Sequence, residues 1–302
     1  MHSAFLISLL VLIFALIFIG IFLNGFIFVR NIGGWLQGKQ LQSINIIMAS
    51  LGLVRIVLLM QSAFTTVLVF SVELRNLVMI YAHYIFTAQI FVEFCSAWWG
   101  TVLCVFYCVK ITNYSNRLSI KLKMRISGMV PWLLLGSMLF SLLSSLPYGW
   151  YVFSFHKVNY THIFNGTSSG EINVHINYDS VYIIIIVGSF VPCLLFCVTT
   201  FFLVVPLFKH TRNMNNNQTG FTKSQLDVLL GTIRNVISFL IFYIIYYINR
   251  MLLPLSTKLD NLFFALVCCF FLVACSSLHS AVLIITNVKM KQFIIDALHC
   301  LK

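Results

Sequence analysis

The sequence predicts an all-α membrane protein in which one bundle of seven transmembrane helices occupies the whole chain, residues 1–302. Hydrophobic residues make up 60% of the chain and charged residues only 9%, whereas a soluble domain carries about 25% charged residues. Seven apolar stretches are each long enough to cross a bilayer. The Lys and Arg residues between them fall almost entirely on one side of the predicted membrane. These observations predict helices that face lipid.

Each of the seven stretches exceeds the roughly 20 apolar residues that a helix needs to cross the hydrocarbon core. The apolar runs are continuous and do not alternate with polar residues, so they indicate helices and disfavour a spanning barrel. The first stretch is too long for the apolar region of a signal peptide and lacks basic residues before it, so we expect it to be a span. In order, the predicted spans are residues 4–29, 44–70, 79–109, 129–153, 181–208, 228–253 and 262–286.

The basic residues orient these spans. Arg30 and Lys39 follow the first span, which predicts an N-terminus outside and a cytoplasmic tail over residues 288–302. On this assignment the cytoplasmic segments hold 14 Lys and Arg residues against two acidic residues, Asp227 and Asp296. The excess of positive charge therefore indicates orientation and contact with anionic membrane lipid, and it does not argue for nucleic acid.

The longest predicted outer loop, residues 154–178, is polar. It contains two N-x-[ST] sequons, at Asn159 and Asn165, which are expected to carry glycan. Two further sequons, at Asn113 and Asn217, fall in predicted cytoplasmic segments and should stay unmodified. In the C-terminal tail, apolar residues recur at helical spacing, which predicts an amphipathic helix on the inner surface.

Arg55 lies near the middle of the second span, where an Arg side chain costs about 2.5–3.5 kcal/mol on insertion scales. It must face the bundle interior and find acceptors there. Asn24 in the first span and Ser280 or Asn287 at the seventh are the candidates. Two interpretations stay open, because Arg55 is either a polar switch that rearranges between functional states or a fixed hydrogen-bond anchor.

Glu93 lies in the outer part of the third span. In one interpretation its carboxylate faces a water-filled outer cavity and meets a cationic ligand. In the other it is solvated at the mouth of the bundle or paired with Arg75 or Arg250. Ion pairs at a wet rim are common and weak, so the second interpretation is favoured.

Aromatic side chains gather in the third and sixth spans. Trp98 and Trp99 lie some distance from both predicted membrane boundaries, and one of the two must point inward. An indole there offers a large apolar face and one N–H donor. Tyr243, Tyr246 and Tyr247 lie at helical spacing on the outer half of the sixth span. Together these side chains are able to line a small-molecule pocket, and the alternative is packing or contact with lipid.

Two segments resemble a known family. Residues 106–116 read FYCVKITNYSN, similar to the F-Y-x-x-K-I-A-x-F-S signature of the bitter-taste (type 2 taste) receptors. Residues 279–291 read HSAVLIITNVKMK, which resembles the H-S-x-x-L-I-x-x-N-P-K-L-K motif of that family. The chain has no Asp-Arg-Tyr triplet after the third span and no Cys pair joining that span to the second outer loop. Both absences argue against the rhodopsin-like receptors.

The resemblance implies an outer ligand pocket and inner helix ends that contact a G protein. Trp98 falls at the family's pocket tryptophan, whereas Val102 and Cys269 replace a pocket Asn and Glu, so a more apolar pocket is expected. Val288 replaces the Pro of the seventh-span motif, and we expect a straighter helix end there. The expected ligand-binding residues are Trp98, Trp99, Val102, Thr66, Tyr243, Tyr246, Tyr247, Cys269 and Leu272. The residues expected to act in activation and G-protein contact are Arg55, Tyr107, Lys110, Lys209, His210, His279, Ser280 and Lys289.

The function implied is a plasma-membrane receptor that binds bitter small molecules and activates a heterotrimeric G protein of the gustducin type. A receptor of another seven-span family, such as vomeronasal type 1, is the first alternative. A small-solute transporter is the second, although few charged residues, chiefly Arg55 and Glu93, lie well inside the predicted spans. No cofactor or metal is expected, and no arrangement of catalytic residues indicates an enzyme.

Overall fold

The structure, a computed structural model, describes residues 2–36, 38, 42–70, 75–111, 117–161, 168–216, 223–287 and 290–293. Seven long helices account for most of these residues, which confirms the predicted fold class. The helices are α1 (His2–Leu36), α2 (Ser43–Phe70), α3 (Arg75–Ile111), α4 (Arg117–Tyr151), α5 (Tyr178–Asn216), α6 (Lys223–Lys258) and α7 (Leu262–Thr286). Each contains an apolar segment of 25 to 32 residues, enough to cross a bilayer.

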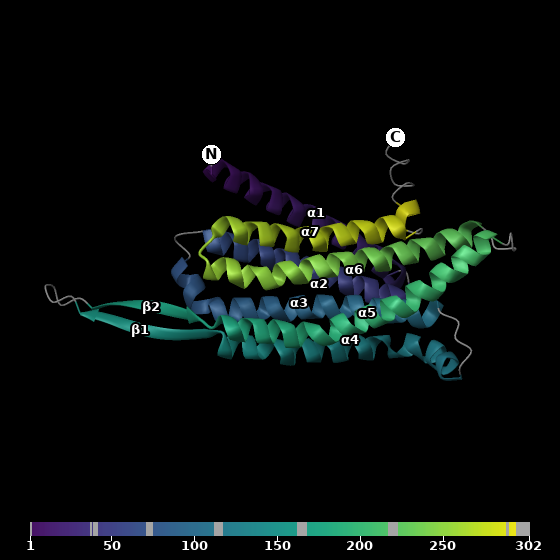
Figure 1. The fold of residues 1–302 in the computed structure, drawn as a ribbon, viewed down its shortest axis with the longest axis horizontal. Helices are drawn as coiled ribbons and strands as arrows, with labels where there is room; N and C mark the ends of the chain where they lie inside the picture. Colours follow the sequence, from purple (N-terminus) through teal and green to yellow (C-terminus); the bar gives the residue numbers. More distant parts are fainter. Residues whose placement is uncertain are drawn as a thin grey trace.

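The helices lie side by side and antiparallel, with each packed against its neighbour in sequence and α7 packed against α1 (Figure 1). α3 packs against α2, α4 and α5, and α2 contacts α1, α3, α4 and α7. α1 diverges from the bundle toward its N-terminus (Figure 1). In lipid, a helix satisfies the hydrogen bonds of its backbone N–H and C=O groups internally. The contacts between the helices are therefore made by side chains.

Several helices are longer than their predicted spans. α4 begins at Arg117 instead of residue 129, α5 continues to Asn216 instead of 208, and α6 begins at Lys223 instead of 228. The additional turns are polar or basic, and hydropathy detects only the apolar part of a helix. Hydropathy therefore predicts the membrane-crossing segments, and the helices continue beyond them in polar and basic turns.

The predicted outer loop contains a two-stranded antiparallel hairpin, which was not expected. β1 (Phe153–Thr161) pairs with β2 (Ser168–Ile176), starting from the pair Phe153 and Ile176. The hairpin projects beyond the bundle from the junction of α4 and α5 (Figure 1). At its base the buried Phe153 ring packs on Phe86 and Tyr148, with centroids 6.0 Å apart in each pair. We call this end of the bundle the hairpin end and the other the opposite end.

α7 ends at Thr286, and Val288, where a straighter helix end is expected, lies outside the described residues. Asn287 has an extended backbone, with φ −86° and ψ 107°, and its side-chain oxygen accepts the N–H of Met290 at 3.3 Å. Asn is a favoured N-cap residue, and here it interrupts one helix and starts the next turn without a proline. Residues 290–293 are helical, and the rest of the predicted tail helix lies outside the described residues.

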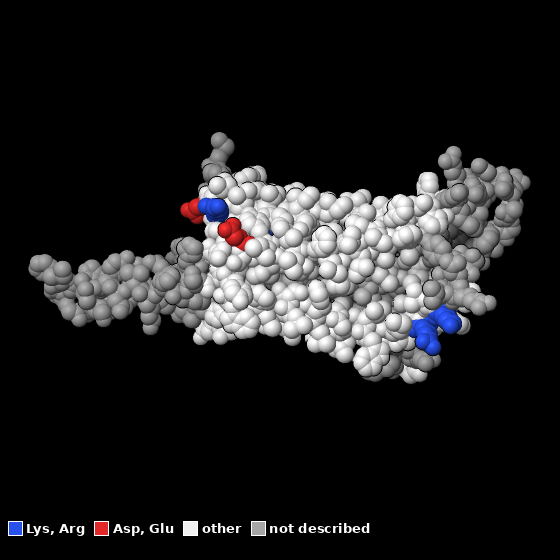
Figure 2. Space-filling view, turned by 60° about the horizontal axis from the view of Figure 1, so that its bottom comes forward, with Lys and Arg blue, Asp and Glu red and all other residues white. Residues whose placement is uncertain are grey.

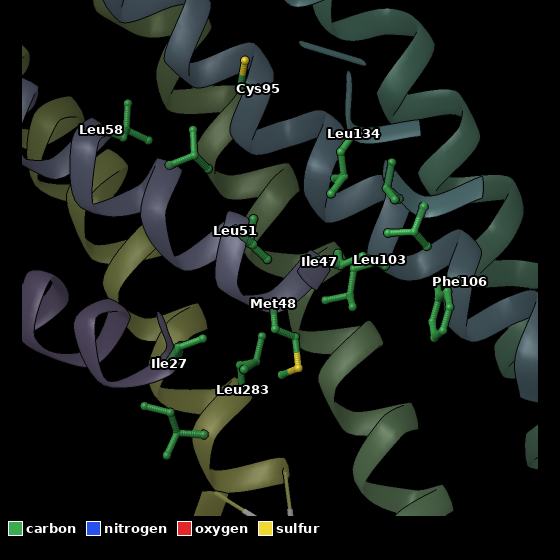
Figure 3. Close-up of a cluster of buried hydrophobic side chains, with 14 of the residues drawn as sticks. Ile27, Ile47, Met48, Leu51, Leu58, Cys95, Leu103, Phe106, Leu134 and Leu283 are labelled. Carbon is green, nitrogen blue, oxygen red and sulfur yellow. The ribbon is translucent and has the colours of Figure 1, made fainter. Parts of the chain in front are cut away.

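The largest apolar core joins α2, α3, α4 and α7 toward the opposite end of the bundle (Figure 3). Ile47, Met48 and Leu51 of α2 project into it and meet Leu103 of α3 and Leu283 of α7. These five side chains are no more than 3% exposed. The core fixes the helices around the polar groups described below.

The two ends of the bundle differ in charge, because acidic side chains lie beside a basic one at the hairpin end and basic side chains alone are visible at the other (Figure 2). Among the described residues, the opposite half carries basic side chains and no acidic one, namely Arg30, Lys110, Lys121, Lys123, Arg125, Arg234 and Lys291. The hairpin end carries Asp179, Asp260 and Lys258. This asymmetry is the one on which the predicted orientation depends.

Candidate functional site: a polar cavity at the centre of the bundle

A cavity of about 50 Å³, which we call the central cavity, lies between α2, α3, α6 and α7. Its lining mixes apolar and aromatic side chains with a few polar groups, as small-molecule pockets do. The lining residues are Arg55, Leu58, Glu93, Ser96, Ala97, Phe239, Phe242, Tyr243, Tyr246, Cys275, Ser276 and His279. Of the expected ligand-binding residues, Tyr243 and Tyr246 are in this set.

Arg55 belongs to a buried hydrogen-bond network that connects α1, α2 and α7. Its Nη1 donates to Nδ1 of His279 at 2.5 Å and to the Ser280 hydroxyl at 3.4 Å. Ser280 in turn donates to Oδ1 of Asn24 at 2.8 Å. The expected partners Ser280 and Asn24 are thus part of the network, while His279, the closest partner, was not foreseen as one. No contact between Arg55 and the expected partner Asn287 is among the described ones.

The contact with Arg55 fixes the tautomer of His279. A guanidinium only donates hydrogen bonds, so Nδ1 must be the acceptor and Nε2 must carry the proton. His279 is 1% exposed, and its Nε2 has no hydrogen-bond partner among the described residues. The central cavity is therefore lined by a histidine with an unused donor, which is costly to bury without an acceptor.

Phe239 separates Arg55 and His279 from α5. Its ring centroid lies 4.3 Å from that of His279, 5.7 Å from the guanidinium carbon of Arg55 and 4.8 Å from the ring of Phe196. The cation and the ring are close enough for a cation–π interaction. The ring also fills the space left by Gly100, where an added Cβ would lie 2.0 Å from Phe239 Cζ.

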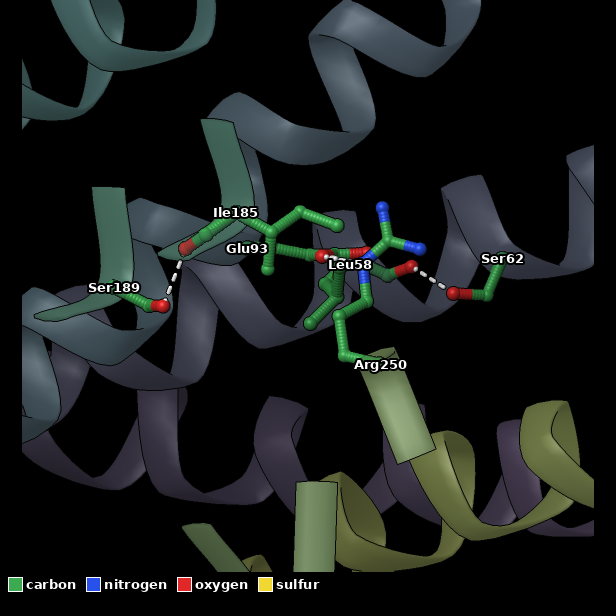
Figure 4. Close-up of polar contacts among 6 residues, drawn as sticks. All are labelled: Leu58, Ser62, Glu93, Ile185, Ser189 and Arg250. Atoms are coloured by element: carbon green, nitrogen blue, oxygen red, sulfur yellow. Dashed lines mark hydrogen bonds and ion pairs between the residues drawn. The ribbon is translucent and has the colours of Figure 1, made fainter. Parts of the chain in front are cut away.

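Glu93 and Arg250 form an ion pair between α3 and α6, with Arg250 Nε 2.7 Å from a carboxylate oxygen of Glu93 (Figure 4). The predicted pairing with Arg250 is confirmed, but the expectation of a wet rim was wrong. The two side chains are 5% and 9% exposed, because Gln89 and Tyr246 surround the carboxylate and Tyr148 lies beside the guanidinium. A buried pair of this kind leaves an uncompensated charge when one partner is removed.

Trp98 and Trp99 do not line the central cavity in this structure. The Trp98 ring meets Phe140 of α4 edge-on, with centroids 5.2 Å apart, and Nε1 of Trp99 donates to the Leu134 carbonyl at 3.4 Å. Helical geometry gives the reason, because the residues of α3 that line the cavity, Glu93, Ser96 and Ala97, are spaced at three to four residues and share one face. Once Glu93 is assigned to the interior of the bundle, the helical spacing in the sequence predicts which face of α3 lines the cavity.

The other expected ligand-binding residues lie elsewhere in the bundle. Val102 is buried in the core of Figure 3, and Cys269 packs against the core shared by α1, α2 and α7. Tyr247 packs on the core at the hairpin end. The Thr66 hydroxyl donates to the Ser62 carbonyl of its own helix at 2.7 Å, and Leu272 is half-buried. Their roles in ligand binding stay predictions.

A second cavity of about 250 Å³, the opposite-end cavity, lies between the same four helices where α7 ends. Among the described residues, those that line it are uncharged, and its polar groups include Tyr107, Asn45 and Asn235. Oδ1 of Asn235 is buried without a partner among the described residues. Lys110, nearby at the end of α3, donates to the Lys123 carbonyl at 3.3 Å.

Several expected site residues cannot be placed by their side chains. Lys209 and His210 lie in α5 with undescribed side chains, and Lys289 and Asn165 lie outside the described residues. Asn159 lies in β1 opposite Gly170, and its side chain is also undescribed.

A bundle of seven membrane-length helices with a small polar cavity at its centre and a wider one at one end is the architecture of a seven-helix membrane receptor. The family model described as "Taste receptor protein (TAS2R)" matches residues 1–302 of the chain. The chain therefore belongs to the type 2 taste receptor family, the bitter-taste receptors of the G-protein-coupled class. It is a multi-pass protein of the plasma membrane.

Similar proteins occur in birds and mammals. Taste receptor type 2 member 40 of Gallus gallus is 31% identical over 293 residues, which cover 93% of this chain and 91% of the relative. Taste receptor type 2 member 39 of Homo sapiens is 32% identical over 302 residues, covering 96% and 86%. Taste receptor type 2 member 4 of Pongo pygmaeus is 28% identical over 276 residues, covering 91% of each.

Proposed function

We propose that bitter small molecules bind in the central cavity. We further propose that the conformational change on binding is transmitted along α6 to a heterotrimeric G protein of the gustducin type. The observation that carries this proposal is the position of Phe239 and Asn235. Phe239 lines the central cavity, and Asn235, one helical turn away on α6, lines the opposite-end cavity. The same helix thus forms a wall of both cavities.

The small volume of the central cavity makes ligand binding a conformational event. About 50 Å³ is far below the roughly 300–1,000 Å³ of a pocket that holds a drug-sized molecule. An agonist must therefore displace side chains, and Phe239, Tyr243 and Tyr246 all belong to α6. A ligand that binds the displaced arrangement more tightly shifts the population toward it.

At the opposite end, α6 and α7 are in close contact. A Cβ added to Gly231 would lie 2.8 Å from the backbone oxygen of Thr286. Movement of α6 away from α7 would widen the opposite-end cavity and present its uncharged polar lining, including the unpaired Asn235 oxygen, to the G protein. Lys110, Lys209, His210 and Lys289 are proposed to surround that contact and to meet acidic or carboxyl-terminal groups of the partner.

The test is a calcium or cAMP screen of cells that express the chain with a gustducin-type G protein, against a panel of bitter compounds. Phe239→Ala should lower the maximal response to every agonist found. Ile241→Ala, on a side chain that is 51% exposed on the same helix, is the matched control and should leave it unchanged. A correctly localised protein that answers no compound with any G protein tested would overturn the proposal.

A further inference from the structure

We infer that Arg250 masks the carboxylate of Glu93 and thereby excludes cationic ligands from the central cavity, so that the receptor selects uncharged or acidic molecules with a hydrogen-bond acceptor. The inference rests on the proposed function, because it concerns agonists that enter this cavity. It assigns to Arg250 a role in specificity, although Arg250 does not itself line the cavity.

Arg250 is the charged partner of Glu93 among the described residues. Among the described residues, the side chains beside the carboxylate are Gln89 and Tyr246, and neither carries a charge. Figure 4 also draws two hydroxyls, of Ser62 on α2 and Ser189 on α5, and each is hydrogen-bonded within its own helix. Ser62 donates to the Leu58 carbonyl at 2.8 Å and Ser189 to the Ile185 carbonyl at 2.5 Å. Arg250 is thus the group that neutralises Glu93.

The charges that line the cavity then determine which ligand fits. Within the described part of the chain, the charged lining residues are Arg55 and Glu93. The charge of Glu93 is balanced by Arg250, whereas the partners of Arg55 are His279 and Ser280, which carry no negative charge. A cationic ligand would meet an unbalanced Arg55 and no free carboxylate, in surroundings of low dielectric where like charges repel strongly. An acceptor atom, in contrast, is able to pair with the unused Nε2–H of His279.

The first experiment uses two probes of the same shape, one positively charged and one uncharged. Benzyltrimethylammonium is a cation, and 2,2-dimethylpropylbenzene is its uncharged isostere. The potency with which each probe competes with an agonist from the bitter panel is measured in cells. The surface amounts of the receptor variants are matched by biotinylation. Arg250→Gln should raise the potency of the cation relative to the isostere by about tenfold, because Glu93 is released. Adding Glu93→Gln to this variant should abolish the gain.

The second experiment removes the other partner and reverses the sign. Glu93→Gln leaves Arg250 unpaired, so phenylacetate should gain about tenfold in potency relative to phenylacetamide, its uncharged analogue. Unchanged potency ratios in both single variants, with the panel agonist still active, would overturn the inference alone. Loss of every response in the unmodified receptor would instead overturn the proposed function. A cation gain that persisted in the double variant would show that Glu93 is not the group unmasked.

Discussion

Phe239 of α6 packs against four other helices. Its ring contacts His279 of α7 and Phe196 of α5, lies over Arg55 of α2, and occupies the space above Gly100 of α3. Only a residue without a Cβ leaves room for this ring. The position of α6 against α3 therefore depends on a glycine that hydropathy alone would not single out.

Gly100→Ala should destabilise the bundle, because the added Cβ would overlap the Phe239 ring, which also packs on Phe196 and His279. Overpacking of this kind costs about 1–3 kcal/mol, which a thermal unfolding series on purified receptor would measure. Combining the change with Phe239→Leu should recover part of the loss. The control is Gly136→Ala, where no atom lies within 4 Å of the new Cβ. Equal effects at the two glycines would contradict the packing described for Phe239.

Substitutions of Tyr246 and Trp98 distinguish an aromatic residue that lines the ligand cavity from one that packs between helices. Tyr246 lines the central cavity, so Tyr246→Ala should weaken agonist potency by about tenfold or more. Trp98 packs on Phe140, so Trp98→Ala should lower thermal stability while potency changes little. Dose–response curves at matched surface expression decide between them. A loss of potency confined to Trp98→Ala would restore the pocket role that the resemblance implies for this residue.

At the scale of elements, the helices continue past the apolar segments that predict them, and the outer loop forms a hairpin. The nine pairs of residues between β1 and β2 run from Phe153 and Ile176 to Thr161 and Ser168. Both sequons of the loop thus fall within the hairpin or between its strands. This places the predicted glycan on a projecting element, remote from the central cavity.

Glycosidase treatment should shift the mobility of the expressed protein, and Asn159→Gln combined with Asn165→Gln should remove the shift. Replacement of Asn113 and Asn217, which lie outside the described residues, should leave it intact, because the basic residues predict a cytoplasmic position for both. Glycan that remained after loss of the two hairpin sequons would reverse the predicted orientation of the bundle.

At the scale of the whole molecule, the local signals in the sequence were sufficient for the number, order and type of the helices. Apolar runs and basic loops are contiguous, so they can be read without knowing which helices touch. The partner of Glu93 could be narrowed to Arg75 or Arg250, but its burial depends on how Tyr148 and Tyr246 close over the pair. The direction of Trp98 depends on the rotation of α3 about its axis, which a single apolar helix does not reveal.

Communication between the two cavities should be visible in the thermodynamics of the assembled receptor. Lys110→Gln should lower the maximal signal, and it should weaken agonist binding by about fivefold or more only when G protein is present, since coupling between two sites is reciprocal. Lys121, exposed at the same end, provides the control, and Lys121→Gln should behave as the unmodified protein. An identical loss of agonist affinity without G protein would assign Lys110 to the stability of the bundle.

The hairpin has a mechanical consequence for the bundle that carries it. The first paired residues, Phe153 and Ile176, directly follow α4 and precede α5, and paired strands hold their Cα atoms about 5 Å apart. Among the described residues, paired strands thus hold these two helices together at the hairpin end alone. If α5 moves, it should therefore pivot about the base of the hairpin. Its displacement would be small beside the hairpin and largest at the end where the G protein is proposed to bind.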